Sequence, residues 1–211
     1  MAIIEQTIFN SFGNKIMTKD KEIHIVGKMD EPLIFIFDNV LSYTECDSLI
    51  DLAKNRMQRA KIGKSRVVSD IRTSSSMFFE ESENELIQTI ECRVSELMNV
   101  PVSHAEPLQI LHYKAGDQYQ PHFDYFTSGN IENNRVSTLL IYLNDVEKGG
   151  ETYFPSLRFA VTPKKGSAVY FEYFYNDHRL NELTLHAGNP VAAGEKWVAT
   201  QWMRRQRHRH M

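Results

Sequence analysis

The strongest constraint on the fold is a change of pattern near residue 108. From Leu108 onward, short runs rich in β-branched and aromatic residues alternate with turn residues, and no helical periodicity separates them. The runs span residues 108–113, 136–143, 168–174, 183–186 and 197–203. Strands at this spacing favour an antiparallel double sheet or jelly roll over a parallel α/β sheet. The second half of the chain is therefore predicted to be a β-barrel-like core.

Two segments of the first half have helical periodicity instead. Ser42 and Glu45 have the spacing of a capping box, and apolar residues then recur on one helical face. Ser82 and Glu85 repeat this spacing before a second apolar stripe, which stops before Pro101. The fold class is thus predicted as α+β and mainly β, with N-terminal helices that brace one face of a sheet.

One domain is expected, because 211 residues with 42% hydrophobic content can bury one substantial core. The continuous apolar run at residues 33–37 predicts a buried strand, and a weaker pattern predicts another at residues 22–26. We divide the chain into an N-terminal arm (1–31), a main domain (32–203) and a basic tail (204–211).

Charge and composition argue against two classes of partner. The formal net charge of −3 gives no general reason to bind nucleic acid, and no run of about 18 apolar residues could cross a membrane. Cys46 and Cys92 lack the spacing of a disulfide framework or a zinc site, which indicates a reducing compartment. Residues 1–13 lack a secretory leader pattern. A cytoplasmic location is expected.

A possible metal site lies within the β-rich half. His122 and Asp124 are two residues apart, so on a strand their side chains would point to the same side. His186, at the end of the predicted strand 183–186, offers a third ligand. Two imidazoles and one carboxylate on one face leave adjacent positions open and suit iron(II). With eight histidines in the chain, however, one His-x-Asp pair also arises by chance as an ordinary polar pair.

Lys196 follows His186 by ten residues and lies within an apolar strand pattern. A buried lysine is unfavourable unless an anion meets it. The alternative is that its long side chain reaches solvent.

Several motifs together resemble the prolyl 4-hydroxylase branch of the 2-oxoglutarate oxygenases. The resemblance runs from about Pro32 to Trp202 and includes the segment Arg72-Thr73-Ser74. Its motifs are Leu111-His112-Tyr113-Lys114-Ala115-Gly116, Tyr119-Gln120-Pro121-His122-Phe123-Asp124, Gly149-Gly150-Glu151-Thr152, His186-Ala187-Gly188-Asn189-Pro190-Val191 and residues 194–202. This resemblance implies a double-stranded β-helix core, also called a jelly-roll or cupin-like fold.

The resemblance also implies roles for individual residues. It makes His122, Asp124 and His186 the iron(II) ligands, and Tyr113, Thr152 and Lys196 the contacts to 2-oxoglutarate. A dianionic co-substrate would then find a cation for each carboxylate, the iron at one end and the ammonium at the other. For Tyr113 and Thr152 the alternative is ordinary strand packing.

The resemblance places Tyr119, Arg135 and Trp202 in a groove for the peptide substrate. Trp202 lies six residues after Lys196, hence on the same face of a strand, and an aromatic wall suits a proline ring. The alternatives are a solvated charge for Arg135 and a core position for Trp202. Where animal and plant members usually carry a histidine, two residues after the tryptophan, this chain has Arg204.

The implied activity is hydroxylation of a peptidyl proline with O2 and 2-oxoglutarate, releasing succinate and CO2, with ascorbate rescuing oxidised enzyme. The substrate would be a proline-containing peptide or protein, with collagen-like repeats one option, and a homodimer is compatible with the sequence. Two alternatives stay open: the same chemistry on lysine, a nucleobase or a small molecule, and a non-catalytic cupin-like binding module. Residues 61–75 and 127–134 are polar and could cover the substrate.

Overall fold

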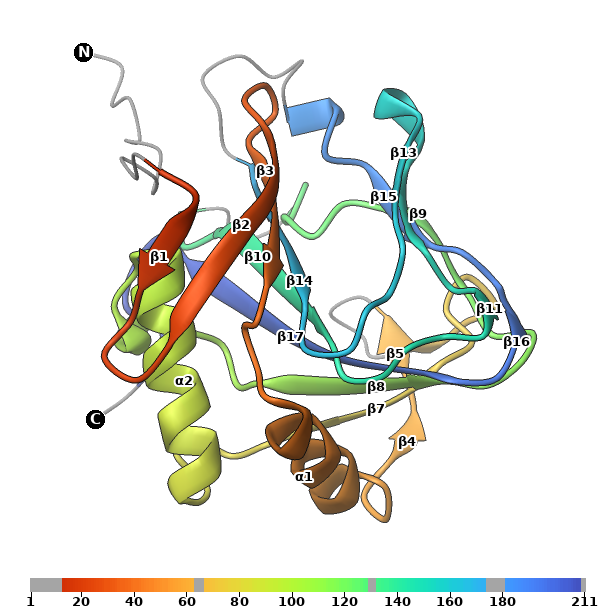
Figure 1. Cartoon of the computed structure of the whole chain (residues 1–211). Coiled ribbons are helices and arrows are strands. Elements are labelled where there is room, and N and C mark those ends of the chain that lie inside the picture. The colour runs from red at the N-terminus through yellow and green to blue at the C-terminus, as the bar shows by residue number, and fades with distance from the viewer. Residues whose placement is uncertain (1–12, 63–66, 129–131, 174–180, 210–211) are drawn as a thin grey trace.

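The computed structural model describes residues 13–62, 67–128, 132–173 and 181–209. Over these ranges the chain forms two α-helices and two antiparallel sheets that face each other, with smaller ribbons at the edges (Figure 1). No helix in the described ranges is long and apolar enough to cross a membrane.

The larger sheet has nine strands in the order β1-β2-β3-β14-β10-β17-β8-β7-β4. In chain order these strands are β1 (Lys15–Met17), β2 (Glu22–Met29), β3 (Ile34–Asp38), β4 (Gln58–Arg59), β7 (Ser75–Phe78), β8 (Gln109–Tyr113), β10 (Arg135–Tyr142), β14 (Ala168–Glu172) and β17 (Lys196–Arg204). All of their pairings are antiparallel, with β10, β17 and β8 adjacent in the middle of the sheet.

The smaller sheet has four strands in the order β13-β12-β15-β9. These are β9 (Tyr119–His122), β12 (Thr152–Phe154), β13 (Phe159–Val161) and β15 (His186–Gly188). The two ribbons consist of β5 (Lys61–Ile62) with β6 (Val67–Val68), and β11 (Lys148–Gly149) with β16 (Val191–Ala193); the 3₁₀ turns are η1 (Val102–His104) and η2 (Pro155–Leu157).

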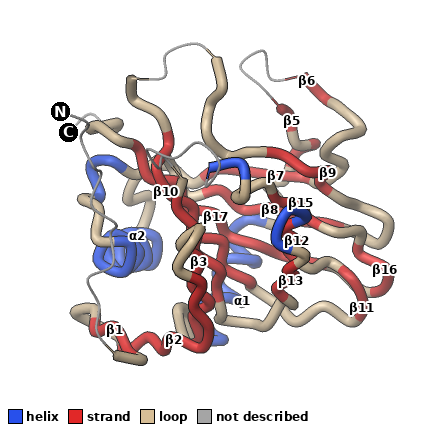
Figure 2. The backbone as a smooth tube through the Cα atoms, turned by 90° about the horizontal axis from the view of Figure 1, so that it is seen from above, coloured by secondary structure: helices blue, strands red, loops and turns tan. Residues whose placement is uncertain are grey.

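Helices α1 (Tyr43–Ala53) and α2 (Glu85–Met98) cover the outer face of the larger sheet (Figures 1 and 2), as the apolar stripes predict. The capping box of α1 is present: the Glu45 amide donates to Ser42 Oγ and the Ser42 amide donates to the Glu45 carboxylate. The cap predicted for α2 is wrong. Asn84, rather than Ser82, accepts from the Ile87 amide, and it lies directly before the first helical residue.

Strand β17 separates two hydrophobic clusters because its side chains alternate between the faces of the sheet. Trp197, Ala199 and Met203 belong to the cluster under the helices. Lys196 and Trp202 face the opposite way, into the space between the two sheets. This alternation places a lysine and a tryptophan beside the site.

The predicted strands agree with the structure except near residue 183. The strand expected at residues 183–186 instead begins at His186 and runs to Gly188. Leu183 to Leu185 form a turn, in which the amides of Thr184 and Leu185 donate back to Asn181 and Glu182. Of the run 168–174, residues 168–172 are strand and residue 174 lies outside the described ranges.

The N-terminal arm joins the sheet. The strand predicted at residues 22–26 extends to Met29, and it pairs with the edge strand β1 on one side and with β3 on the other. Arg93 of α2 secures this region, because its buried guanidinium binds the carboxylates of both Asp20 and Glu45 at 2.6 Å. The hairpin of the arm is thereby tied to both helices.

Candidate functional site

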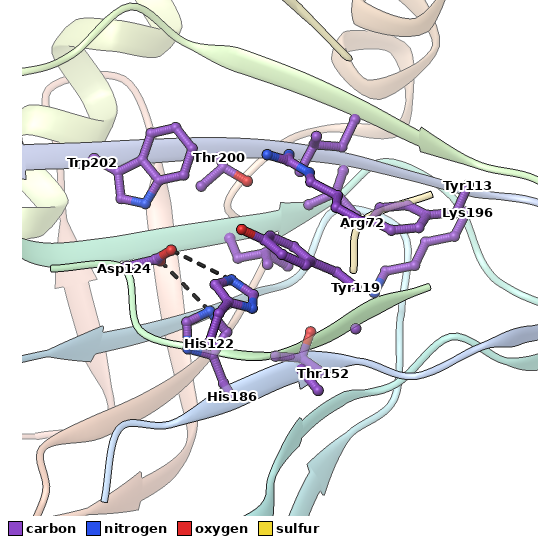
Figure 3. Close-up of a pocket in the computed structure, with 15 residues that line it drawn as sticks. Arg72, Tyr113, Tyr119, His122, Asp124, Thr152, His186, Lys196, Thr200 and Trp202 are labelled. Carbon is purple, nitrogen blue, oxygen red and sulfur yellow. Dashed lines mark ion pairs between the residues drawn. The ribbon is translucent and has the colours of Figure 1, made fainter. Parts of the chain in front are cut away.

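The three predicted metal ligands meet where β9 pairs with β15. His122 and His186 are direct cross-strand partners in this pair, and Asp124 follows just beyond the end of β9. One ligand atom from each residue lies within 4.8 Å of the others. Figure 3 shows the three side chains converging, with Asp124 Oδ1 3.6 Å from His122 Nε2 and Asp124 Oδ2 3.6 Å from His186 Nε2.

Backbone carbonyls select the tautomer of both imidazoles. His122 Nδ1 lies 2.9 Å from the Gln120 carbonyl oxygen, and His186 Nδ1 lies 3.0 Å from that of Thr184. Since a carbonyl only accepts, each Nδ1 must carry a hydrogen, so in the neutral ring the lone pair of Nε2 is directed at the shared centre. Burial, followed by the neighbouring His186, lowers the pKa of His122. Neutral imidazole is the form that binds a metal.

Asp124 is fixed in its ionised form. Its Oδ2 accepts a hydrogen bond of 2.7 Å from Thr138 Oγ1, which is buried in β10. Burial alone would raise the pKa of Asp124, but the imidazoles of His186 and His122, and then Arg135, lower it. Two imidazoles and a carboxylate fit iron(II), and they leave open coordination positions.

A pocket between the two sheets adjoins this triad, and it contains Tyr113, Thr152 and Lys196 (Figure 3). Lys196 and Tyr113 are cross-strand partners in β17 and β8, and the ammonium lies 5.4 Å from the Tyr113 ring centre. Thr152 accepts a hydrogen bond of 2.8 Å from the Tyr142 hydroxyl, so its own hydroxyl hydrogen remains to be donated. The three residues expected to hold a co-substrate thus line one cavity.

Lys196 is buried, with 2% of its surface exposed, and it does not reach solvent. No acidic group of the described residues lies within ion-pair distance of its ammonium. Burial lowers the pKa of Lys196 to about 7, against a weaker opposing effect of Glu151. The buried ammonium of Lys196 therefore has no acidic partner among the described residues, and an anionic ligand in this pocket would supply one.

The Gly149-Gly150 pair explains how the chain reaches Thr152. Gly149 has a φ of 78°, and a Cβ at this position would lie 2.4 Å from the Pro190 carbonyl oxygen. Only glycine tolerates this combination of left-handed backbone and close approach. The pair brings β12 beside β15, where Thr152 is the cross-strand partner of Gly188.

A groove continues outward from the pocket, and the predicted substrate residues Tyr119, Arg135 and Trp202 all line it. The Arg135 guanidinium lies 3.7 Å from the Trp202 ring centre and donates to the Asp124 carbonyl oxygen at 3.2 Å. Its other nitrogens bind both carboxylate oxygens of Glu106 at 2.7 Å. Arg135 is thus held in place, with 15% of its side chain exposed.

Sequence reasoning did not single out Glu106 or Arg72 as residues of the site. Burial would raise the pKa of Glu106, but hydrogen bonds from Arg135 lower it, so the carboxylate stays charged. Nothing in the local sequence distinguishes Glu106 from a surface acid. Arg72 is buried between the pocket and the groove, 4.7 Å from the Tyr119 ring centre. Its place in the motif Arg72-Thr73-Ser74 was the available signal.

The structure describes only part of each of the two segments that were predicted to cover the substrate. Residues 63–66 and 129–131 lie outside the described ranges, so a covering role for 61–75 or 127–134 stays a prediction. Among their described residues, Arg72 lines the groove.

Comparisons with known proteins agree with this geometry. A sequence model described as the 2OG-Fe(II) oxygenase superfamily matches residues 108–204. The chain is 39% identical over 200 residues to probable prolyl 4-hydroxylase 3 of Arabidopsis thaliana, covering 82% of this chain and 69% of the relative. It is 37% identical over 230 residues to probable prolyl 4-hydroxylase 10 of the same plant, covering 96% and 78%.

Solved structures show the same fold. A viral collagen prolyl hydroxylase from Paramecium bursaria Chlorella virus-1, in complex with 2-oxoglutarate, superposes with a TM-score of 0.67 at 33% identity, covering 81% of this chain and 95% of that one. The two facing sheets are therefore the predicted double-stranded β-helix. The chain belongs to the prolyl 4-hydroxylase family of iron(II)- and 2-oxoglutarate-dependent oxygenases.

Proposed function

We propose that the protein hydroxylates a prolyl residue within a peptide, using O2 and 2-oxoglutarate and releasing succinate and CO2. One observation carries the proposal. A face of two histidines and an aspartate opens into a pocket with a buried ammonium that has no acidic partner among the described residues, and the pocket continues into a groove walled by Trp202.

His122, Asp124 and His186 would hold iron(II). Iron with 2-oxoglutarate supplies the oxygen-activating chemistry, by which one oxygen atom enters a carbon-hydrogen bond while the co-substrate becomes succinate and CO2. The protein contributes rigid ligands. Both imidazoles are oriented by backbone carbonyls, and Asp124 is oriented by Thr138, so the three donors are held close together before a metal binds.

Lys196 would pair with the distal carboxylate of 2-oxoglutarate, with Tyr113 and Thr152 as hydrogen-bond donors. An ion pair formed in this buried place keeps Lys196 protonated and compensates its desolvation. The charges are complementary, because iron(II) with one aspartate leaves one positive charge and Lys196 adds the second, which matches a dianion.

The substrate proline would lie against Tyr119, Arg135 and Trp202. A proline ring is apolar and rigid, and an indole face gives it a stacking surface close to the metal. Glu106 fixes the Arg135 guanidinium, which in turn stacks on the Trp202 indole. The groove wall is therefore preorganised for the substrate. The names of the Arabidopsis relatives support proline as the target.

The test is mass spectrometry of proline-containing peptides after incubation with iron(II), 2-oxoglutarate and ascorbate. We expect one added oxygen atom on a proline and an equal amount of succinate. Succinate without peptide oxidation would indicate the same chemistry on another substrate. Neither succinate nor oxidation would favour a binding module.

Four finer features belong to the same proposal. Collagen-like repeats are the first peptides to assay, since the superposed viral enzyme is named a collagen prolyl hydroxylase. Ascorbate would restore iron oxidised in turnovers without substrate. The two cysteines, both unpaired, support a cytoplasmic location. Light scattering of the purified protein would distinguish a monomer from the homodimer that the sequence allows.

A further inference from the structure

The basic tail of the sequence is built into the fold. We call residues 204–209 the tail segment. Its last residue, Arg209, has 5% of its surface exposed and donates to both carboxylate oxygens of Glu91 in α2, at 2.9 and 2.6 Å. Glu91 is also buried, with 2% exposed. A paired charge in this environment is a strong constraint, because either partner alone would be buried without compensation.

The same guanidinium holds the backbone that carries Glu106. Arg209 Nε donates to the Ala105 carbonyl oxygen at 3.1 Å, and Nη2 reaches the Glu106 carbonyl oxygen at 3.4 Å. The Glu106 carboxylate in turn fixes Arg135, which stacks on Trp202. A continuous chain of polar contacts therefore leads from α2 to the groove wall.

The beginning of the tail segment holds Asn133, in the connection between β9 and β10. Arg204 Nη1 donates to the Asn133 carbonyl oxygen at 2.7 Å. The Gln206 amide donates to Asn133 Oδ1 at 2.8 Å, and Asn133 Nδ2 donates to the Arg207 carbonyl oxygen at 3.3 Å. Asn133 is thus bound through both its backbone and its side chain.

The neighbouring residue transmits this attachment to the groove. The Arg205 amide donates to the Asn134 carbonyl oxygen. The Asn134 side chain accepts from the amides of Phe126 and Arg135 and donates to the Phe126 carbonyl oxygen. The Phe126 ring lies beneath both Arg135, at 5.1 Å, and Arg204, at 4.8 Å. The two routes from the tail segment therefore converge on Arg135.

We propose that the tail segment is a positioning element for the peptide groove, with the buried Arg209–Glu91 pair as its anchor. The inference rests on the proposed function, since it assigns the outer groove to the peptide. Arg204 links the tail segment to Glu106 and Asn133.

Asp124 contacts Arg135 through its carbonyl oxygen, while Thr138 holds its carboxylate. The two histidine ligands and the 2-oxoglutarate pocket do not depend on the anchor. Their residues are placed by strand pairing, His122 opposite His186 and Lys196 opposite Tyr113. Loosening the tail segment should consequently affect the peptide and leave the co-substrate unaffected. A general loss of structure would affect both.

The test compares Arg209→Ala with Arg207→Ala in the full chain. Arg207 is a matched control, because it is an exposed arginine of the same segment whose side chain makes no described contact. For Arg209→Ala we expect exchange of the Phe126 and Arg135 amides to accelerate about tenfold without peptide. We also expect the peptide KM to rise about tenfold and the 2-oxoglutarate KM to stay unchanged.

Equal exchange and equal peptide KM in the two variants would overturn the proposal. If Arg209→Ala also accelerates exchange throughout β14, then Asn133→Ala decides, because it removes the two side-chain hydrogen bonds of Asn133 to the tail segment and leaves the buried pair intact. Unchanged exchange at Phe126 in that variant would refute the proposal. A wild-type protein that oxidises no peptide would contradict the proposed function, while the exchange measurement would still judge the tail segment.

Discussion

The metal end of the site and the outer groove are built in different ways. At the metal end, the two histidine ligands are cross-strand neighbours, and backbone carbonyls orient their rings. In the groove, Arg135 is held by side chains from distant parts of the chain, chiefly Glu106 and Trp202. Strand register is shared by every residue of a sheet, whereas an ionic network depends on each member.

This difference predicts at which end of the site the residues can change between members of the family. A register shift of one residue would turn His122 away from His186 and destroy the site. In the groove, different side chains could support the same wall. In this chain Arg204 takes part in that support, because it contacts Glu106, Asn133 and Phe126. We therefore expect chemistry to be invariant at the metal end and peptide preference to be set in the groove.

The largest effect is expected at the metal end. Asp124→Ala removes the carboxylate ligand, so turnover should be abolished and the affinity for iron(II) strongly reduced. Anaerobic titration with iron(II) measures the affinity, and succinate production measures turnover. Thermal unfolding without metal shows whether the variant is folded. Normal turnover in Asp124→Ala would refute the assignment of the ligands.

Lys196→Met should weaken 2-oxoglutarate binding without impairing the metal site. Loss of a charge-assisted hydrogen bond corresponds to about 1.5–3 kcal/mol, or roughly a 10- to 150-fold higher KM for the co-substrate. The ligand-free variant should melt at a higher temperature at pH 6, because a buried ammonium has been removed. An unchanged KM for 2-oxoglutarate would contradict the pairing of Lys196 with the co-substrate.

The pH dependence of 2-oxoglutarate affinity should report the same lysine. Free Lys196 has a pKa of about 7, and a bound carboxylate would raise it, so binding takes up a proton above pH 7. Affinity should be constant below pH 7 and fall roughly tenfold per pH unit above it, until the pKa of the complex is reached.

Calorimetric titration between pH 6 and 9 measures this slope. Lys196→Arg keeps its charge over the whole range and should flatten the curve. A wild-type affinity that does not change from pH 7 to pH 9 would show that the ammonium is not the partner of the co-substrate.

The smallest effect is expected in the groove. Trp202→Ala removes the stacking face, which should raise the peptide KM about tenfold, since aromatic contacts of this kind contribute about 0.5–1.5 kcal/mol beyond the buried area. Trp202→Phe keeps an aromatic face, so its peptide KM should lie between those of the wild type and of Trp202→Ala. Steady-state kinetics with varied peptide measures the change. A larger effect on the 2-oxoglutarate KM than on the peptide KM would contradict the assignment of Trp202 to the peptide groove.

Much of the fold follows from local patterns in the sequence. The capping box at Ser42 and the apolar stripe before Pro101 predict the two helices, and β-rich runs predict the central strands. These predictions succeed because neighbouring residues determine caps and periodicity. The strand expected to end at His186 instead begins there, since its hydrogen bonds come from β9 and β12, far away in the chain.

The sequence by itself determined which groups of chemical interest the chain carries: His122, Asp124, His186 and Lys196 within a β-rich half that resembles the prolyl 4-hydroxylases. Only the tertiary structure decided how they meet. Cross-strand register brings His122 to His186, and burial leaves Lys196 without an acidic partner among the described residues. The tertiary structure likewise decided which side chains contact Glu106 and the tail segment. Such contacts join residues about 30 to 120 positions apart, and only the folded chain selects them from the many charges available.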